Sequence, residues 1–188
     1  MCNITGNTVA IHITSSPTDV HAEAALASSI TSAAREVNNN KCEPIVQQLA
    51  RQYRGTFDDD ERSRLKCLIQ EEYWKALKDV TPWKLLPEHV NMLTDSAVGG
   101  IRVDHAEFRH SILLYCEINT VEALNHLKWM IDSGELSRLF SRMLCDYADF
   151  EIVASASLSA QQYNMALKSI RGKANCYNNL FNVRNRND

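Results

Sequence analysis

Alternating and helical patterns of hydrophobic residues follow one another twice between Ser111 and Ile170. Successive side chains of a strand point to opposite faces, so the alternation from Ser111 to Ile118 predicts a strand with one buried face. That face holds Ile112, Leu114, Cys116 and Ile118. A second strand is predicted from Asp149 to Ser155, with Phe150, Ile152 and Ala154 on its buried face.

Helix signals follow both strands. Asn119 with Glu122, and Ser159 with Gln162, have the spacing of capping boxes, which mark helix starts. Gly134 predicts a left-handed break in the first helix, because glycine adopts positive φ without steric cost. The predicted helices cover residues 119–144, in two pieces, and 159–171.

The N-terminal part repeats this order. The alternation of Val9, Ile11 and Ile13 with polar or small residues predicts a strand from Thr8 to Thr14. Ser16 is predicted to cap the helix that follows, with Pro17 at its first position and Asp19 at its third. Its apolar stripe contains Val20, Ala24, Ala27, Ile30, Ala34 and Val37.

Residues 42–90 have only helical periodicity and predict an inserted helical hairpin. We therefore predict one α+β domain over residues 1–172, with a ferredoxin-like two-layer sandwich, a mainly antiparallel sheet and the hairpin at an end or edge. The asparagine-rich residues 173–188 are predicted to be a flexible tail. The expected core contains Ile11, Ile13, Ile112, Leu114, Cys116, Leu124, Leu127, Phe140, Phe150, Ile152 and Leu167.

Composition gives little support for several classes of partner. The formal net charge of -3 provides no global field that attracts nucleic acid or an anionic membrane. No apolar run is long enough to span a bilayer, and residues 1–6 lack the pattern of a signal peptide, so we expect a cytoplasmic protein. The six cysteines form no C-x-x-C pair, so neither a zinc site nor another cofactor site is expected.

No residue pattern predicts catalysis. Cys116 has histidines within reach in the sequence, but it lies on a predicted core face, where a thiol is inert. The basic cluster of Arg102, His105, Arg109 and His110 has no metal-ligand spacing, and the acidic run 58–61 fits a first helical turn. We therefore predict a protein that is not an enzyme.

The faces opposite the predicted core suggest a binding role instead. Leu113, Tyr115 and Glu117 lie on that face of one strand and Val153 on that of another, and an apolar patch with a charged border is typical of a contact site. With Arg102 and Arg109 as the basic border, these residues are the predicted partner-binding site. The alternative is that residues 42–90, with Trp74 and Trp83, cover this face as a third layer.

The three strand–helix units resemble the N-terminal domain of the TNF-receptor-associated death-domain adaptor (TRADD) and related invertebrate modules. The resemblance lies mainly in residues 111–170, where Ser133-Gly134-Glu135-Leu136 interrupts a helix between two strands. It implies a ferredoxin-like sandwich and an adaptor of death-receptor or innate-immune signalling whose sheet and loops bind a TRAF-family protein.

Two other functions remain open from the sequence. A ferredoxin-like sheet can bind RNA, which needs outward aromatic residues and a basic surround. The outward positions here include one aromatic residue, Tyr115, and two acids, Glu117 and Glu151, so binding of nucleic acid is not expected. A regulatory domain for a small molecule would need a glycine-rich strand end, for which Gly99-Gly100 is the candidate.

Overall fold

The computed structural model describes residues 8–52, 59–85 and 100–184. Within these ranges an antiparallel sheet has the strand order β2-β3-β1-β4. Its strands are β1 (Thr8–Ser16), β2 (Ile101–Phe108), β3 (Ile112–Ile118) and β4 (Val153–Ser157). This order, with helices between β1 and β2 and between β3 and β4, is ferredoxin-like, so the predicted α+β fold class is confirmed.

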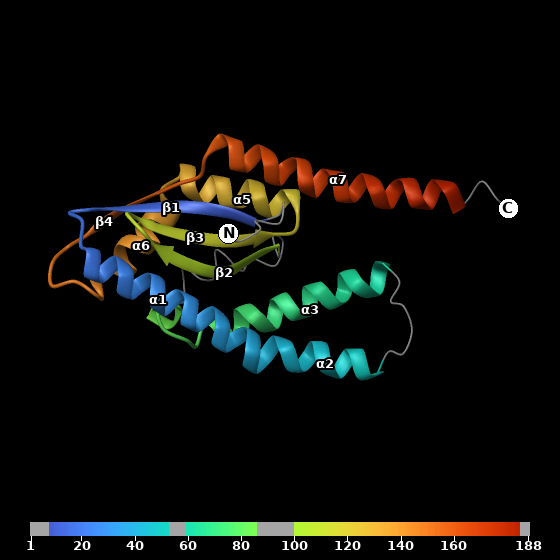
Figure 1. The fold of residues 1–188 in the computed structure, drawn as a ribbon, viewed down its shortest axis with the longest axis horizontal. Helices are drawn as coiled ribbons and strands as arrows, with labels where there is room; N and C mark the ends of the chain where they lie inside the picture. The colour runs from blue at the N-terminus through green and yellow to red at the C-terminus, as the bar shows by residue number, and fades with distance from the viewer. Residues whose placement is uncertain (1–7, 53–58, 86–99, 185–188) are drawn as a thin grey trace.

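The helices pack on one side of the sheet and extend beyond it (Figure 1). They are α1 (Val20–Val37), α2 (Glu43–Gln52), α3 (Asp59–Leu77), α5 (Val121–Asp132), α6 (Glu135–Cys145) and α7 (Ala160–Arg184). A π-helix, η1 (Asn38–Cys42), joins α1 directly to α2, and a short 3₁₀-helix, η2, spans Trp83–Leu85. The apolar stripe predicted for the first helix ends at Val37, but the chain remains helical through the asparagines that follow.

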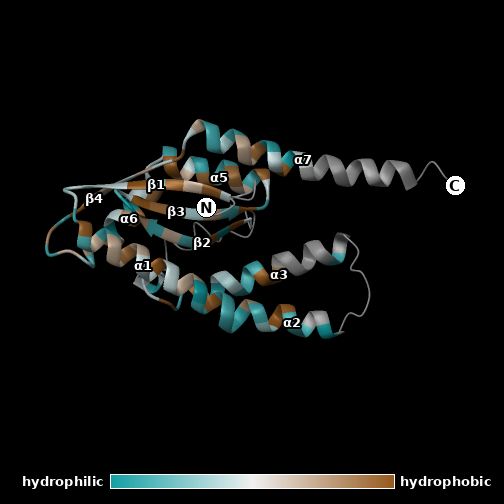
Figure 2. Ribbon diagram, viewed as in Figure 1, coloured by the Kyte–Doolittle hydropathy of each residue, from teal (hydrophilic) through white to brown (hydrophobic). Residues whose placement is uncertain are grey.

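The buried faces of the strands form the core with the inner sides of the helices, and Figure 2 shows hydrophobic residues concentrated on β1, β3 and α5. Alternate residues of β3 are buried as predicted. Two predicted core residues differ: Leu167 is partly buried against the core, and Phe150 is 46% exposed. Strand β4 begins at Val153, four residues later than predicted, so Phe150 lies in the preceding loop, and of the three residues predicted to face the core here only Ile152 and Ala154 are buried.

Two helices begin later than the sequence predicted. The N-cap of α1 is Asp19, whose carboxylate accepts hydrogen bonds from the N–H groups of His21 and Ala22, rather than Ser16. Ser16 is still paired with Val153 in the sheet, so it cannot cap a helix. The N-cap of α5 is likewise Thr120 rather than Asn119, because the Asn119 N–H donates to the Gly100 carbonyl (2.8 Å). The left-handed break at Gly134, with φ of 79°, is confirmed.

Helix α7 continues to Arg184, although the sequence predicted that it would end at Arg171. Gly172 lies inside this helix, and a Cβ atom added there would meet no other atom within 4 Å. A glycine that adopts right-handed helical geometry weakens a helix without ending it, which explains the error.

Gly172→Ala is therefore expected to raise the free energy of unfolding by about 0.5–1 kcal/mol, since alanine loses less backbone entropy in a helix. Urea titration followed by circular dichroism measures the change. Gly134→Ala is the matched control and should have the opposite sign, because its positive φ strains any residue with a Cβ atom. Equal effects of the two substitutions would contradict this assignment.

Side chains from helices satisfy backbone groups at the edge of β2. The Ile101 carbonyl accepts hydrogen bonds from Gln70 Nε2 (2.9 Å) and Trp74 Nε1 (2.8 Å), and the Val103 carbonyl accepts one from the Tyr73 hydroxyl (2.6 Å). Helix α1 adds Thr31, whose hydroxyl donates to the Ala106 carbonyl and accepts from the Ala106 N–H. The hairpin therefore lies at a sheet edge, one of the two positions predicted for it.

The edge of β4 is closed in the same way by α6. Ser137 and Ser141 accept hydrogen bonds from the N–H groups of Ala156 (3.0 Å) and Ala154 (2.7 Å). Cys145 Sγ accepts one from the Ile152 N–H (3.4 Å). Ser137, Ser141 and Cys145 are four residues apart and share one side of the helix, so α6 occupies the position of a further strand. Both edges of the sheet therefore have backbone groups already bonded, which opposes strand addition.

Candidate functional site

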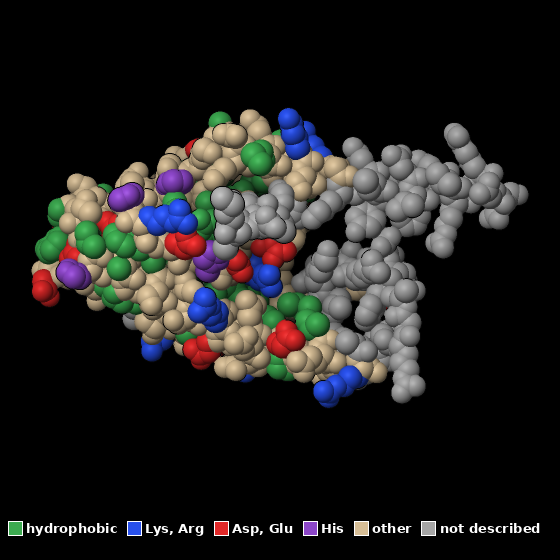
Figure 3. All heavy atoms as spheres, in the orientation of Figure 1, with side chains coloured by type: hydrophobic (Ala, Val, Ile, Leu, Met, Phe, Trp, Pro, Cys, Tyr) green, Lys and Arg blue, Asp and Glu red, His purple; other side chains and the backbone are tan. Residues whose placement is uncertain are grey.

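The sheet face opposite the core carries the predicted site. Register pairs Arg102 with Glu117 and His105 with Tyr115 across β2 and β3, and Leu113 follows on β3. We call these five residues the β2–β3 surface. Figure 3 shows basic, acidic and histidine side chains gathered over these two strands.

Contacts within the β2–β3 surface hold its side chains in place. Arg102 and Glu117 form an ion pair of 2.5 Å, with both side chains about one third exposed. The rings of His105 and Tyr115 stack with centroids 4.3 Å apart. Asp104 Oδ2 lies 2.8 Å from His105 Nδ1 on the other side of the imidazole. The surface is thus a stacked aromatic pair beside a charged pair, and ordering it for a partner costs little conformational entropy.

A β-bulge brings His105 into this surface. The ladder between β2 and β3 shifts between Val103 and His105, so Asp104 is the extra residue and His105 faces Tyr115. Bulges re-aim side chains in this way. From the sequence, His105 was predicted only as a surface member of a basic cluster, because simple alternation gives no signal for a bulge.

The β2–β3 surface is partly exposed. Leu113, Tyr115 and Glu117 are each half-buried by their neighbours in the sheet. Trp74 and Trp83 instead belong to the core cluster, where their rings meet edge to face at 6.3 Å. The alternative in which these two tryptophans cover the outward face is therefore not what the described residues show.

The structure separates two of the predicted site residues from the rest. Val153 pairs with Ser16, whereas Leu113 pairs with His12, so Val153 lies roughly 13 Å further along the sheet and about 10 Å across it. Arg109 lies in the turn after β2, where it forms an ion pair with Glu107 (3.0 Å). One partner side chain cannot contact Tyr115 and Val153 together.

Buried thiols in this structure are not activated nucleophiles. Burial raises the pKa of Cys116 to about 12 and also raises the pKa of Cys42. A thiolate is the reactive form, so neither cysteine is primed for attack at neutral pH. No group of three metal-ligating side chains occurs among the residues that the structure describes.

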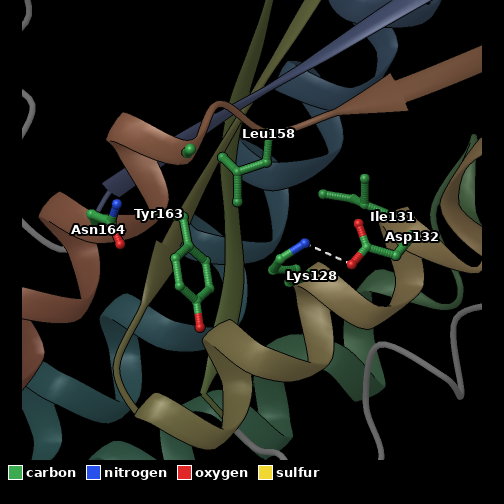
Figure 4. Close-up of a pocket in the computed structure, with 7 residues that line it drawn as sticks. Lys128, Ile131, Asp132, Leu158, Tyr163 and Asn164 are labelled. Atoms are coloured by element: carbon green, nitrogen blue, oxygen red, sulfur yellow. Dashed lines mark hydrogen bonds and ion pairs between the residues drawn. The ribbon is translucent and has the colours of Figure 1, made fainter.

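Two of the hollows among the described residues are small. One, of about 160 Å³, is lined by Ile69, Gln70, Arg102, Glu117 and Asn119 and adjoins the β2–β3 surface. The other, of about 150 Å³, lies between α5 and α7, where the Lys128–Asp132 ion pair (2.6 Å) spans one side and Tyr163 and Leu158 supply apolar walls (Figure 4). Of these two, only the first adjoins the β2–β3 surface, where it offers space for one side chain of a partner.

Comparison of the chain with protein-family models, with curated proteins and with solved structures gives no match. Among the described helices, none has an apolar stretch long enough to cross a lipid bilayer.

Proposed function

We propose that this protein is a non-enzymatic interaction module of the adaptor type that binds another protein through the β2–β3 surface. The observation that carries the proposal is the position of half-buried Leu113 and Tyr115 beside a charged border, on the sheet face opposite the core. Aromatic and arginine side chains dominate the energy of many protein interfaces.

The backbone groups at both edges of the sheet are already hydrogen-bonded, which favours a partner that binds the face of the sheet over one that adds a strand. A partner that added a strand would have to displace Tyr73 and Trp74 from β2, or the Ser137–Ser141 row from β4. Each displacement would leave buried polar groups unpaired, at about 1–3 kcal/mol per group. Binding on the open face requires no such loss.

The resemblance to the TRADD N-terminal domain names the partner class. We propose a TRAF-family adaptor, and with it a role in death-receptor or innate-immune signalling in the cytoplasm. The RNA alternative gains no support, because Glu107 and Glu117 lie on the same sheet face as Tyr115 and would repel phosphate.

Tyr115→Ala is expected to weaken binding to an isolated TRAF domain by about 1–3 kcal/mol, or roughly 5- to 150-fold in Kd, since truncated aromatic anchors cost this much. Isothermal titration calorimetry with the full chain measures it. Trp129→Ala is the control, because Trp129 is an aromatic side chain outside the β2–β3 surface, 51% exposed on α5. Absence of binding by the wild-type chain would refute the TRAF assignment, and equal loss in both variants would refute the surface.

A further inference from the structure

Exposed apolar side chains gather at one end of the sandwich, away from the β2–β3 surface. Val20 is 55% exposed, Phe150 46% and Val153 60%. The pairing of Ser16 with Val153 places the start of β4 beside the end of β1, and α1 begins shortly after that end. Figure 3 shows hydrophobic side chains at this end of the molecule, on the left. Large apolar side chains clustered in this way are typical of contact sites.

A hollow of about 420 Å³ lies next to this cluster, between the C-terminal end of α6 and the start of β4. Val153 forms part of it, together with Cys145 and Ile152. The hydrogen bonds between Cys145 Sγ and the backbone of Ile152 fix this wall, so the hollow is preformed. Its volume falls in the range of sites that hold a side chain or small ligand.

The border of the hollow is acidic. Asp146 and Glu151 line it, and Asp149 lies between them in the exposed loop. None of these three carboxylates forms an ion pair with any residue that the structure describes. Arg142 is the one basic residue among the lining side chains, and it too has no ion-pair partner there. The local balance is therefore negative.

We infer that this hollow is a second protein-binding site, which takes a short peptide segment with one large apolar side chain flanked by basic residues. The apolar side chain enters the hollow against Val153 and Ile152. The basic residues approach Asp146, Asp149 and Glu151. Unpaired carboxylates around a desolvated apolar contact select a basic segment over an acidic one.

This site is independent of the proposed adaptor function. It lies on β4 and α6, whereas the TRAF-family partner is proposed to contact β2 and β3. Loss of one interaction leaves the other intact, so the two proposals fail separately. Together they would let one chain hold two partners at once.

The test uses the full ¹⁵N-labelled chain and the capped peptide acetyl-Lys-Lys-Phe-Lys-Lys-amide, titrated by heteronuclear NMR. We expect saturable shifts of the amides of Cys145, Asp146, Glu151 and Val153. Peptides with glycine in place of phenylalanine, or with glutamate in place of lysine, should bind at least about fivefold more weakly, since each lacks one of the two contacts. Added salt should weaken the binding of the lysine peptide.

Substitutions at three exposed positions should change the affinity for the peptide in opposite directions. Glu151→Gln and Val153→Ser should weaken binding of the lysine peptide, and Arg142→Gln should strengthen it, because it removes the one opposing charge from the border. Met165→Ser is the matched control, since Met165 is 58% exposed on α7. Absence of saturable shifts, shifts centred elsewhere, or equal binding of the glutamate peptide would overturn the inference.

Discussion

Trp74→Ala is expected to lower the free energy of unfolding by roughly 3–5 kcal/mol, the usual cost of truncating a buried tryptophan or phenylalanine. Trp74 is 4% exposed and contacts the rings of Tyr73 and Trp83 edge to face, with centroids 5.6 and 6.3 Å away. Its Nε1 also donates to the Ile101 carbonyl at the edge of β2. The substitution therefore removes packing and an edge contact together.

Trp74→Phe separates these two contributions. It keeps an aromatic ring but removes the hydrogen bond, and the Ile101 carbonyl retains Gln70 as a donor. We expect a smaller loss of about 1–2 kcal/mol. Chemical denaturation monitored by near-ultraviolet circular dichroism reports both variants. A loss below about 1 kcal/mol for Trp74→Ala would mean that α3 does not depend on the sheet edge for its position.

The sequence predicted the strands better than it predicted the side chains that hydrogen-bond to the edges of the sheet. Alternation identified the buried faces of β1 and β3, because side chains on one face share one environment. The bonds from Tyr73 and Trp74 to β2 could not be predicted, since they join residues about thirty positions apart through tertiary packing. The serine row of α6 did carry a signal, because Ser137, Ser141 and Cys145 recur every four residues on a buried helix.

Capping signals failed for one physical reason at two places. Ser16 and Asn119 are good capping residues, but both are held by hydrogen bonds of the sheet, so the next suitable side chain takes the role. The N-cap therefore lies one residue later than predicted in α5 and three residues later in α1. Strand β4 also begins later than predicted, and Phe150 is left exposed before it.

The candidate surface was predicted in part. Leu113, Tyr115, Glu117 and Arg102 do lie together, because cross-strand register follows once the strands are known. The sequence could not place Val153, whose distance from Tyr115 depends on the stagger of β4 against β1. It also missed His105, which the bulge turns toward Tyr115.

Gly100→Ala is expected to lower the free energy of unfolding by about 2–4 kcal/mol, which combines overpacking with partial loss of a helix cap. An added Cβ would lie 2.8 Å from both Ala123 Cβ and Thr120 Oγ1. Thr120 is the N-cap of α5, and Ala123 is fully buried. The start of α5 would have to move, and with it the hydrogen bond from the Ala123 N–H to Thr120 Oγ1.

A double-mutant cycle with Ala123→Gly tests whether the close approach is the cause. Ala123→Gly alone should cost about 1 kcal/mol, as glycine does inside a helix. In the Gly100→Ala background it should instead recover at least about 1 kcal/mol, because removal of the Ala123 methyl group makes room for the new one. Additive losses in urea titrations would show that Gly100 is required for another reason. Recovery would show that α5, which follows directly from β3 and the candidate surface, is positioned by contact of its first turn with the start of β2.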